Sequence, residues 1–240
     1  MSIVLASSKA KYTILVCYQN YFDNSQILVQ TTISWIYNYQ NLLILVPKNL
    51  SKKILIVNAT TQSELDKRAN NIFLLIQNLA KHLKVNDKSV DWLDLHTEEK
   101  LLTTLAWKEN DSKILEYQAR FKDAELIIFA YETKLGATPA LLKNYIDNVL
   151  GTSFGYIRDG VFCRGNLADK KIVVLNFDER AGWLAKGVLG NSQGQFWNRE
   201  IRYYLEFKTI KLLQFWNYRT VGNDQLNKWG KKVDELVLGL

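Results

Sequence analysis

The sequence predicts an α/β fold built on a doubly wound parallel β-sheet, and two observations lead to this expectation. Short apolar runs rich in β-branched residues stand at 52–59, 125–131 and 170–177, with charged residues at their start. Runs of this kind are typical of strands that are buried on both faces of a parallel sheet. A loop and a segment of helical periodicity follow each run, which implies right-handed crossovers with helices on both faces of the sheet.

The segment after the first expected strand has the apolar spacing of a helix that packs on a sheet. Apolar residues recur there three and four positions apart, so they share one face of the helix. Further along the chain the pattern predicts a strand at 90–95, a helix at 114–121, a last strand at 211–222 and a C-terminal helix at 224–236. The apolar face of the first helix comprises Ala69, Ile72, Phe73, Ile76, Leu79, Ala80 and Leu83.

The first 50 residues do not follow this alternation of strands and helices, and we expect them to form an N-terminal extension to a domain at 51–240. Residues 24–47 contain no charged side chain, which raises the alternative of a membrane segment. Gln, Thr and Asn residues interrupt this tract, whereas a spanning helix needs about 20 predominantly apolar residues. A packed or loosely attached extension is therefore favoured over a membrane anchor.

Composition and charge narrow the functional classes. The chain carries 31 Lys and Arg residues against 24 Asp and Glu residues, a formal net charge of +7. These basic residues are scattered in ones and twos, so no stripe or motif predicts nucleic-acid binding. Cys17 and Cys163 lack the spacing of a zinc site, and two isolated thiols fit a reducing cytoplasm. No secretory signal pattern opens the sequence, so we expect a cytoplasmic protein.

In an open α/β sheet a ligand binds at the carboxyl ends of the strands, where the strand order reverses. This rule selects the loops at 58–66, 132–138 and 176–183. In the first loop, Thr60, Thr61 and Ser63 place hydroxyl groups beside a helix N-terminus, whose free N–H groups favour a phosphate. Ser63 together with Asp66 equally fits a capping box, so an ordinary helix cap remains the alternative.

The second loop leads into a helix with a proline at its start. Thr138 is placed to cap this helix, and Pro139 fits its first position. A backbone N–H at that position would have no partner within the helix, so its absence in proline costs nothing. Gly136 lets the backbone turn sharply or approach a flat ligand closely. A plain strand-to-helix turn is the alternative interpretation of these residues.

The third loop, NFDERAGW, also follows an expected sheet strand. Asn176 and Arg180 supply polar groups there. The ring of Phe177 or Trp183 is a candidate for stacking on an aromatic ligand. The pattern by itself is unspecific.

Several motifs in the centre of the chain occur in a specific order. Pro139 is followed by LKNYID at 142–147, GTSFGY at 151–156 and LADKKIVVLN at 167–176. Residues 124–176, which contain them, resemble the centre of the flavodoxin-like NAD(P)H oxidoreductases, the family of FMN-dependent NADH-azoreductases and quinone reductases. Segments at 52–60, 92–95 and 218–222 fall where that family has strands, so the similarity covers 52–238.

The resemblance implies a flavodoxin-like three-layer sandwich, with a five-stranded parallel sheet, helices on both faces and FMN at the switch point. It also implies a homodimer and a two-electron ping-pong reaction. In that reaction NADH or NADPH reduces the flavin, which then reduces a quinone or an azo compound. The flavin carries this chemistry and the protein binds and orients it, so no side chain is expected to be catalytic.

The resemblance further implies that the three loops hold FMN. We expect backbone N–H groups of these loops to bind the flavin edge and the phosphate, because such contacts do not depend on side-chain identity. Lys134, if it lies near N1 and O2 of the reduced flavin, would favour the anionic hydroquinone. The expected cofactor-binding residues are Thr60, Thr61 and Ser63 in the first loop, Thr133, Lys134, Leu135 and Gly136 in the second, and Asn176, Phe177, Asp178 and Arg180 in the third.

This chain departs from the family's usual residues in all three loops. SELD at 63–66 replaces a Ser-x-Ser run at the phosphate, and residues 132–136 supply no aromatic wall for the isoalloxazine ring. The third loop has Phe177, Asp178, Glu179 and Arg180 where Ser or Thr with glycines is usual. The alternative is therefore a degenerate flavodoxin-like protein with weak or no FMN binding, which acts as a binding or regulatory module. A hydrolase is disfavoured because no metal cluster or nucleophile–His–acid set is visible.

Overall fold

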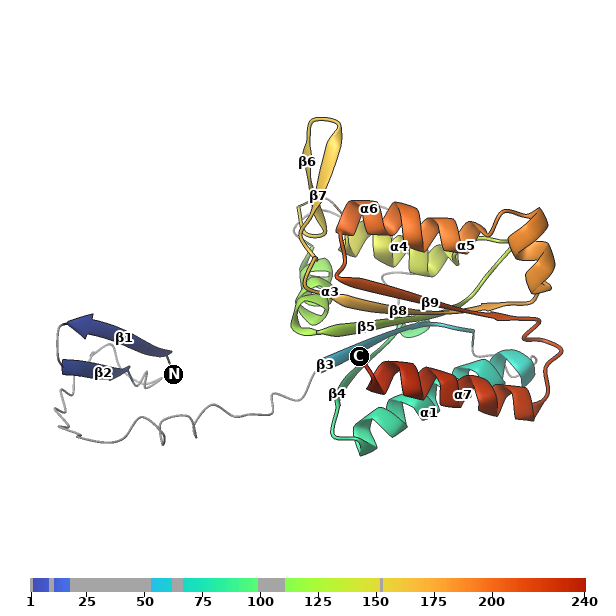
Figure 1. Ribbon diagram of the computed structural model, residues 1–240, viewed down its shortest axis with the longest axis horizontal. Coiled ribbons are helices and arrows are strands. Elements are labelled where there is room, and N and C mark those ends of the chain that lie inside the picture. Colours follow the sequence, from blue (N-terminus) through green and yellow to red (C-terminus); the bar gives the residue numbers. More distant parts are fainter. Residues whose placement is uncertain (1, 9–10, 18–52, 62–66, 99–110, 152) are drawn as a thin grey trace. The chain divides into compact units, whose positions relative to one another are not determined.

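The computed structural model describes residues 2–8, 11–17, 53–61, 67–98, 111–151 and 153–240 of the chain (Figure 1). The chain divides into two compact units, Met1–Asn49 and Leu50–Leu240. The first unit contains an antiparallel hairpin of β1 (Ser2–Ser8) and β2 (Lys11–Cys17). The uncharged tract at 24–47 and the capping box of Ser63 and Asp66 lie outside the described residues.

A five-stranded parallel sheet forms the centre of the second unit. The strands lie in the order β4-β3-β5-β8-β9, which is 2-1-3-4-5 in chain order. This is the flavodoxin-like order that the family resemblance implied, and it reverses between β3 and β5. The strands are β3 (Lys53–Ala59), β4 (Ser89–Asp94), β5 (Leu126–Glu132), β8 (Lys171–Asp178) and β9 (Thr209–Trp216).

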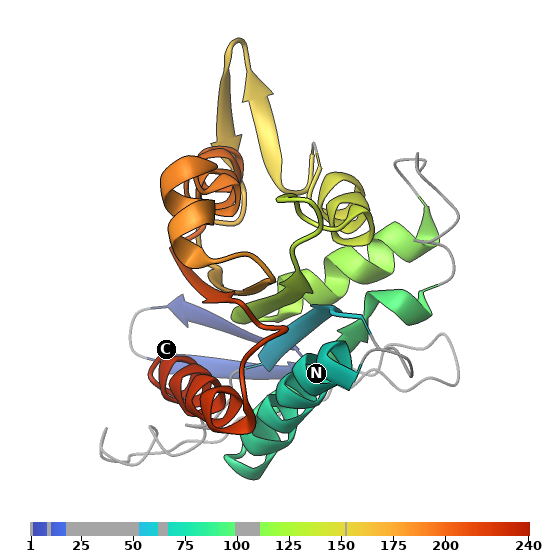
Figure 2. The same cartoon turned by 90° about the vertical axis from the view of Figure 1, so that its right-hand side faces the viewer.

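Helices cover both faces of this sheet, as Figure 2 shows. One layer consists of α1 (Lys67–Val85) and α7 (Asn223–Leu238). The other contains α3 (Ser112–Asp123), α4 (Ala140–Val149) and a continuous run of α5 (Ser192–Gln195), η4 (Phe196–Ile201) and α6 (Arg202–Leu205). Two shorter turns are η2 (Leu95–Thr97) and η3 (Leu184–Val188). Within the described chain, no helix combines the length and the apolar character needed to cross a bilayer.

The sheet separates two apolar cores because successive side chains of a strand point to opposite faces. Leu55, Ile127 and Val174 belong to the core under α3, α4 and η4. Ile56 and Leu175 belong to the core under α1 and α7. Each central strand therefore needs apolar residues on both sides, which explains the continuous apolar runs in the sequence.

The structure corrects two expected boundaries. The last strand ends at Trp216 rather than at 222, because the chain turns at Asn217, where φ is 56°. The helix after β5 begins at Ala140, so Pro139 is the N-cap residue and not the first helical residue. The hydroxyl of Thr138 does not cap this helix; it donates to Oε1 of Gln193 at 3.0 Å.

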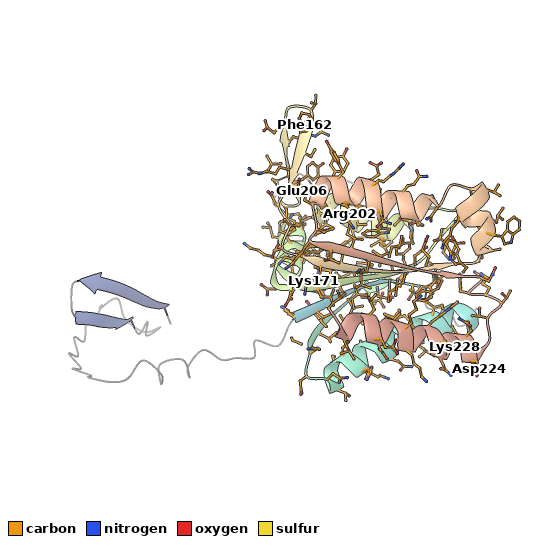
Figure 3. All side chains as sticks on the ribbon, viewed as in Figure 1. Phe162, Lys171, Arg202, Glu206, Asp224 and Lys228 are labelled. Carbon is orange, nitrogen blue, oxygen red and sulfur yellow. The ribbon has the colours of Figure 1, made fainter. Side chains whose placement is uncertain are left out.

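An antiparallel hairpin that the sequence did not predict projects from the layer of α4 and α6 (Figure 1). Its strands are β6 (Tyr156–Asp159) and β7 (Phe162–Gly165). Gly160 makes the tight turn at its tip, with φ of 61°. Figure 3 shows Phe162 near this tip, and the residue is 69% exposed.

Candidate functional site

The carboxyl ends of β3, β5 and β8 bring the three predicted loops to one edge of the sheet. Ala59 pairs with Tyr131 across the β3–β5 boundary, and Glu132 pairs with Phe177 across the β5–β8 boundary. The backbone N–H of Thr133 donates to the carbonyl of Phe177 at 2.8 Å, which extends the last pairing by one bond. The switch point therefore lies directly beside the loop that follows β5.

Glu132 is a buried carboxylate at this switch point, with only 1% of its surface exposed. Its Oε1 accepts a hydrogen bond from the N–H of Thr61 at 3.3 Å. Its Oε2 accepts from Nζ of Lys134 at 3.1 Å and from the hydroxyl of Tyr218 at 3.2 Å. A buried charge needs such partners, because desolvation penalises it strongly when it has none. Glu132 thus joins the ends of β3 and β5 to the segment after β9.

Tyr218 remains a hydrogen-bond donor to this carboxylate. Burial raises the pKa of Tyr218, and the negative charge of Glu132 raises this pKa further. The phenol is therefore protonated throughout the neutral range. Sequence reasoning missed this residue, since 86 positions separate it from Glu132 and no local pattern links them.

The loop after β5 contains a tight turn at residues 134–137. The N–H of Lys134 donates to the carbonyl of Ala137 at 3.0 Å, and the N–H of Ala137 donates back to the carbonyl of Lys134 at 2.9 Å. Leu135 and Gly136 between them have φ of 48° and 82°. Two consecutive positive φ values are the signature of a type I′ turn. Gly136 therefore makes the sharp turn that its position suggested.

This turn exposes its backbone at the sheet edge. The side chain of Leu135 is fully exposed, with a relative accessibility of 106%. Among the described residues, no group accepts a hydrogen bond from the N–H of Leu135 or of Gly136. These two backbone donors are therefore available to a ligand whatever the neighbouring side chains are.

Arg180 lies against the same turn. Its guanidinium binds the buried carboxylate of Asp178 in a bidentate manner, with Nε to Oδ1 at 2.9 Å and Nη2 to Oδ2 at 2.6 Å. These hydrogen bonds are the main reason that the pKa of Arg180 is raised. A Cβ atom on Gly136 would lie 3.0 Å from Nη1 of Arg180. The ion pair therefore sets how closely the second and third loops approach.

The structure corrects the expectation for Thr60. Its hydroxyl donates to Oδ1 of Asn58 at 2.7 Å, and the residue is fully buried. In this arrangement the hydroxyl points inward and is unavailable to a phosphate. Thr61 remains half-exposed beside the switch point, whereas Ser63 lies outside the described residues.

The expectation that the ring of Phe177 stacks on a ligand is wrong. This ring is fully buried and stacks on Phe215 with a centroid distance of 5.0 Å. The ring of Trp229 from α7 lies 6.4 Å from it, so Phe177 belongs to the core under α7. Trp183, the other aromatic candidate, is 73% exposed.

Asn176 and Thr133 meet below the loops rather than at the surface. Nδ2 of Asn176 donates to Oγ1 of Thr133 at 2.5 Å, and both side chains are buried. Oδ1 of Asn176 has no hydrogen-bond partner in the described part of the chain. These two side chains support the ends of β5 and β8. At the rim itself the structure brings together Lys134, Leu135, Gly136 and Arg180.

A groove of about 530 Å³ lies elsewhere, between α1 and α7. Leucine and asparagine side chains line much of it, together with His82 and Asp234, whose Nδ1 and Oδ2 atoms are 2.9 Å apart. No described residue of the three loops contributes to its lining. The switch point therefore remains the candidate site.

The strand order and the gathered loops define a doubly wound α/β protein with a ligand site at the carboxyl edge of its sheet. The profile of the family described as "Flavodoxin-like fold" matches residues 52–215. The chain belongs to this family, among its flavodoxin-like NAD(P)H oxidoreductases.

Relatives and solved structures support this placement. The chain is 31% identical over 157 residues to the FMN-dependent NADH:quinone oxidoreductase 2 of Clostridium perfringens. This match covers 65% of this chain and 72% of that protein. An FMN-dependent NADH-azoreductase of Bacillus anthracis, solved in complex with FMN, matches with a TM-score of 0.57 and 14% identity over 77% of this chain and 97% of the other. An NAD(P)H:quinone oxidoreductase of Methanothermobacter marburgensis matches with a TM-score of 0.54 and 14% identity over 77% and 96%. These two structural matches show a shared fold.

Proposed function

We propose that this chain is an FMN-dependent NAD(P)H oxidoreductase that reduces quinones or azo compounds by two electrons in a ping-pong reaction. The exposed turn at 134–137 carries the proposal, because it presents at the switch point two N–H donors that no described group uses. The names of the relative and of the structural neighbours, which include FMN, quinone and azo reduction, support it.

The residues at the edge of the sheet fit the ring system of FMN. The carbonyl oxygens and the N1 and N5 atoms of the isoalloxazine accept hydrogen bonds, and the N–H groups of Leu135 and Gly136 are donors. Gly136 has no Cβ, so a flat ring can approach this backbone closely. Lys134 adds a cation, 52% exposed in its side chain, beside these donors. When bound, FMN accepts a hydride from NADH or NADPH and passes two electrons to the acceptor.

The phosphate of the cofactor belongs, in this proposal, at the N-terminal end of α1. Free N–H groups and the positive end of the helix dipole favour an anion there. Thr61 and Ser63 remain the proposed hydroxyl donors. Thr60 contributes by shaping the turn through Asn58, since its own hydroxyl is used internally.

Internal pairing of the site's charges favours a second candidate function. Asp178 holds Arg180, and Glu132 holds Lys134, so both cations already have anionic partners. A degenerate flavodoxin-like protein that binds FMN weakly or not at all would retain this arrangement. Such a protein would act as a binding or regulatory module.

Flavin uptake separates the two candidates. The enzyme proposal predicts that the purified chain takes up FMN, absorbs at about 450 nm and is bleached by NADH or NADPH. Addition of a quinone or an azo dye should then restore the absorbance, which tests the two half-reactions separately. A colourless protein that takes up no added FMN would reject the enzyme and favour the binding module.

We further propose that two copies of the chain form a homodimer through the β6–β7 hairpin. Val161 at its tip is 87% exposed, Phe162 is 69% exposed and Ile157 is 46% exposed. A group of exposed apolar side chains is typical of a protein interface. Sedimentation of the wild type and of a Val161→Ser/Phe162→Ser variant tests this: the wild type should sediment as a dimer and the variant as a monomer. A monomeric wild type would contradict the proposal.

A further inference from the structure

A buried glutamine connects the turn at 134–137 to the helical layer above it. Gln193, on α5, is only 3% exposed. Its Nε2 donates to the carbonyl of Gly136 at 2.9 Å, and its Oε1 accepts from the hydroxyl of Tyr131 at 2.6 Å and from that of Thr138 at 3.0 Å. The hydroxyl of Ser192 also donates to the carbonyl of Gly136.

The orientation of the Gln193 amide follows from its neighbours. Nε1 of Trp197, which can only donate, donates to the hydroxyl of Tyr131 at 2.7 Å. Burial raises the pKa of Tyr131, so its phenol keeps its proton and donates it in a hydrogen bond to Gln193. The amide oxygen must therefore face Tyr131. The amide nitrogen in turn faces the carbonyl of Gly136.

Side chains other than Gln193 also contact this turn. Ser192 donates to the carbonyl of Gly136, Lys134 pairs with Glu132, and Arg180 lies beside Gly136. Leu135 adopts φ of 48°, which is unfavourable for a residue with a Cβ, and its fully exposed side chain contributes no packing. The reciprocal bonds between Lys134 and Ala137 close the turn but do not orient it. The carbonyl of Gly136 ties the turn to the helical layer, and Gln193 is the buried one of its two side-chain donors.

We propose that Gln193 is a positioning residue that orients the turn at 134–137 and so presents the N–H groups of Leu135 and Gly136 to the flavin. The functional half of this inference rests on the proposed FMN site. An amide is required at this position because it must accept two hydrogen bonds and donate one at the same time. A carboxylate of the same length accepts hydrogen bonds but cannot donate one. The thioether of a methionine of similar length is only a weak acceptor and has no donor.

Two substitutions at this position and two on a neighbouring residue test the proposal. Gln193→Glu keeps the bonds from Tyr131 and Thr138 but turns an acceptor toward the carbonyl of Gly136. Gln193→Met removes all three bonds. Gln195→Glu and Gln195→Met are matched controls, since Gln195 is exposed on the same helix and donates to Gly190 instead.

Two measurements are made on each full-length variant. The dissociation constant of FMN, from quenching of its fluorescence, should rise about tenfold or more in the Gln193 variants and stay unchanged in the controls. In the flavin-free protein, hydrogen exchange of the Lys134 and Ala137 amides should accelerate in the Gln193 variants. The Thr133 amide, which is bonded to Phe177, should not change.

Acidification provides a readout that loss of packing would not produce. Protonation of the carboxylate introduced by Gln193→Glu restores one O–H donor at this position. The FMN affinity of this variant should therefore recover as the pH falls, relative to the wild type at each pH. Among the described residues, the titratable or charged groups near this position include Tyr131, Asp178 and Arg180, together with the Glu132–Lys134 pair. Burial raises the pKa of Tyr131, and Asp178 raises that of Arg180, so both remain protonated between about pH 5 and pH 8.

The outcomes separate this inference from the proposed function. Unchanged amide exchange at Lys134 and Ala137 in Gln193→Met would overturn the positioning role, whether or not FMN binds. Faster exchange with unchanged FMN affinity would show that the turn is not part of the flavin site. A wild type that takes up no FMN would reject the proposed function, and the exchange data would then decide the positioning role alone.

Discussion

The hydroxyl of Tyr218 donates a hydrogen bond to the buried carboxylate of Glu132 at 3.2 Å, across 86 positions of the chain. This contact joins the segment after the edge strand β9 to the switch point of the sheet. The neighbouring backbone supports it, because the N–H of Asn217 donates to the carbonyl of Arg180 at 3.2 Å. The C-terminal segment therefore completes the candidate site, although no sequence motif assigns it that role.

Replacement of Tyr218 by Phe should destabilise the protein. The variant keeps the ring but leaves Oε2 of Glu132 with one donor fewer, and a buried charged acceptor that loses a partner costs about 1–3 kcal/mol. The free energy of unfolding in urea measures this loss. Tyr203→Phe, at a residue that is 49% exposed, is the control and should change stability little. Equal stability of the two variants would contradict the importance of the contact.

Gly136→Ala should weaken both folding and FMN binding more than the same change at Gly160. Both glycines have positive φ, 82° and 61°, so both variants incur the backbone strain of about 1–2 kcal/mol. Only at Gly136 would the new Cβ meet a neighbour, Nη1 of Arg180 at 3.0 Å, whereas nothing lies within 4 Å at Gly160. Arg180 cannot yield easily because Asp178 holds it by two bonds. Thermal unfolding of the two variants would show equal losses if this contact is unimportant.

Lys134→Ala should make the reduction potential of bound FMN more negative. The substitution removes a cation and leaves the Glu132 carboxylate without its ionic partner, which disfavours the anionic hydroquinone. A change of about 1.4 kcal/mol corresponds to about 30 mV for a two-electron couple, so a shift of roughly that size is expected. Equilibration with a reference dye measures the potential. Lys186→Ala is the control, because this cation lies over the ring of Trp216, 5.6 Å from its centroid, and not beside Glu132. An unchanged potential in Lys134→Ala would reject the role of Lys134.

Truncation of the two aromatic candidates of the third loop should change the free energy of unfolding to very different extents. Phe177→Ala removes a fully buried ring from the core under α7 and should cost about 3–5 kcal/mol. Trp183→Ala changes a side chain that is 73% exposed and should alter stability by less than about 0.5 kcal/mol. Denaturant unfolding of both variants checks the difference. A stable Phe177→Ala protein with impaired flavin binding would instead restore the stacking interpretation.

Much of the fold was predictable because burial on both faces of a strand leaves a direct mark on composition. The runs at 52–59, 125–131 and 170–177 correspond to β3, β5 and β8 with boundaries shifted by one residue at most at each end. The β6–β7 hairpin was not predictable in this way. Its strands have four residues each and expose most of their side chains, so they carry no apolar pattern.

Within the site, the sequence determined the tight turn, since Gly136 is the residue that a positive φ favours, and it placed the three loops at one edge through the strand order. Only the tertiary structure decided which side chains lie at the rim of this edge and which are buried. Phe177 turned inward because α7 supplies Trp229 as its neighbour, and Gly136 was bound by Gln193 from 57 positions away. The physical reason is that backbone preferences are local, whereas burial and hydrogen-bond partners depend on which distant segments pack together.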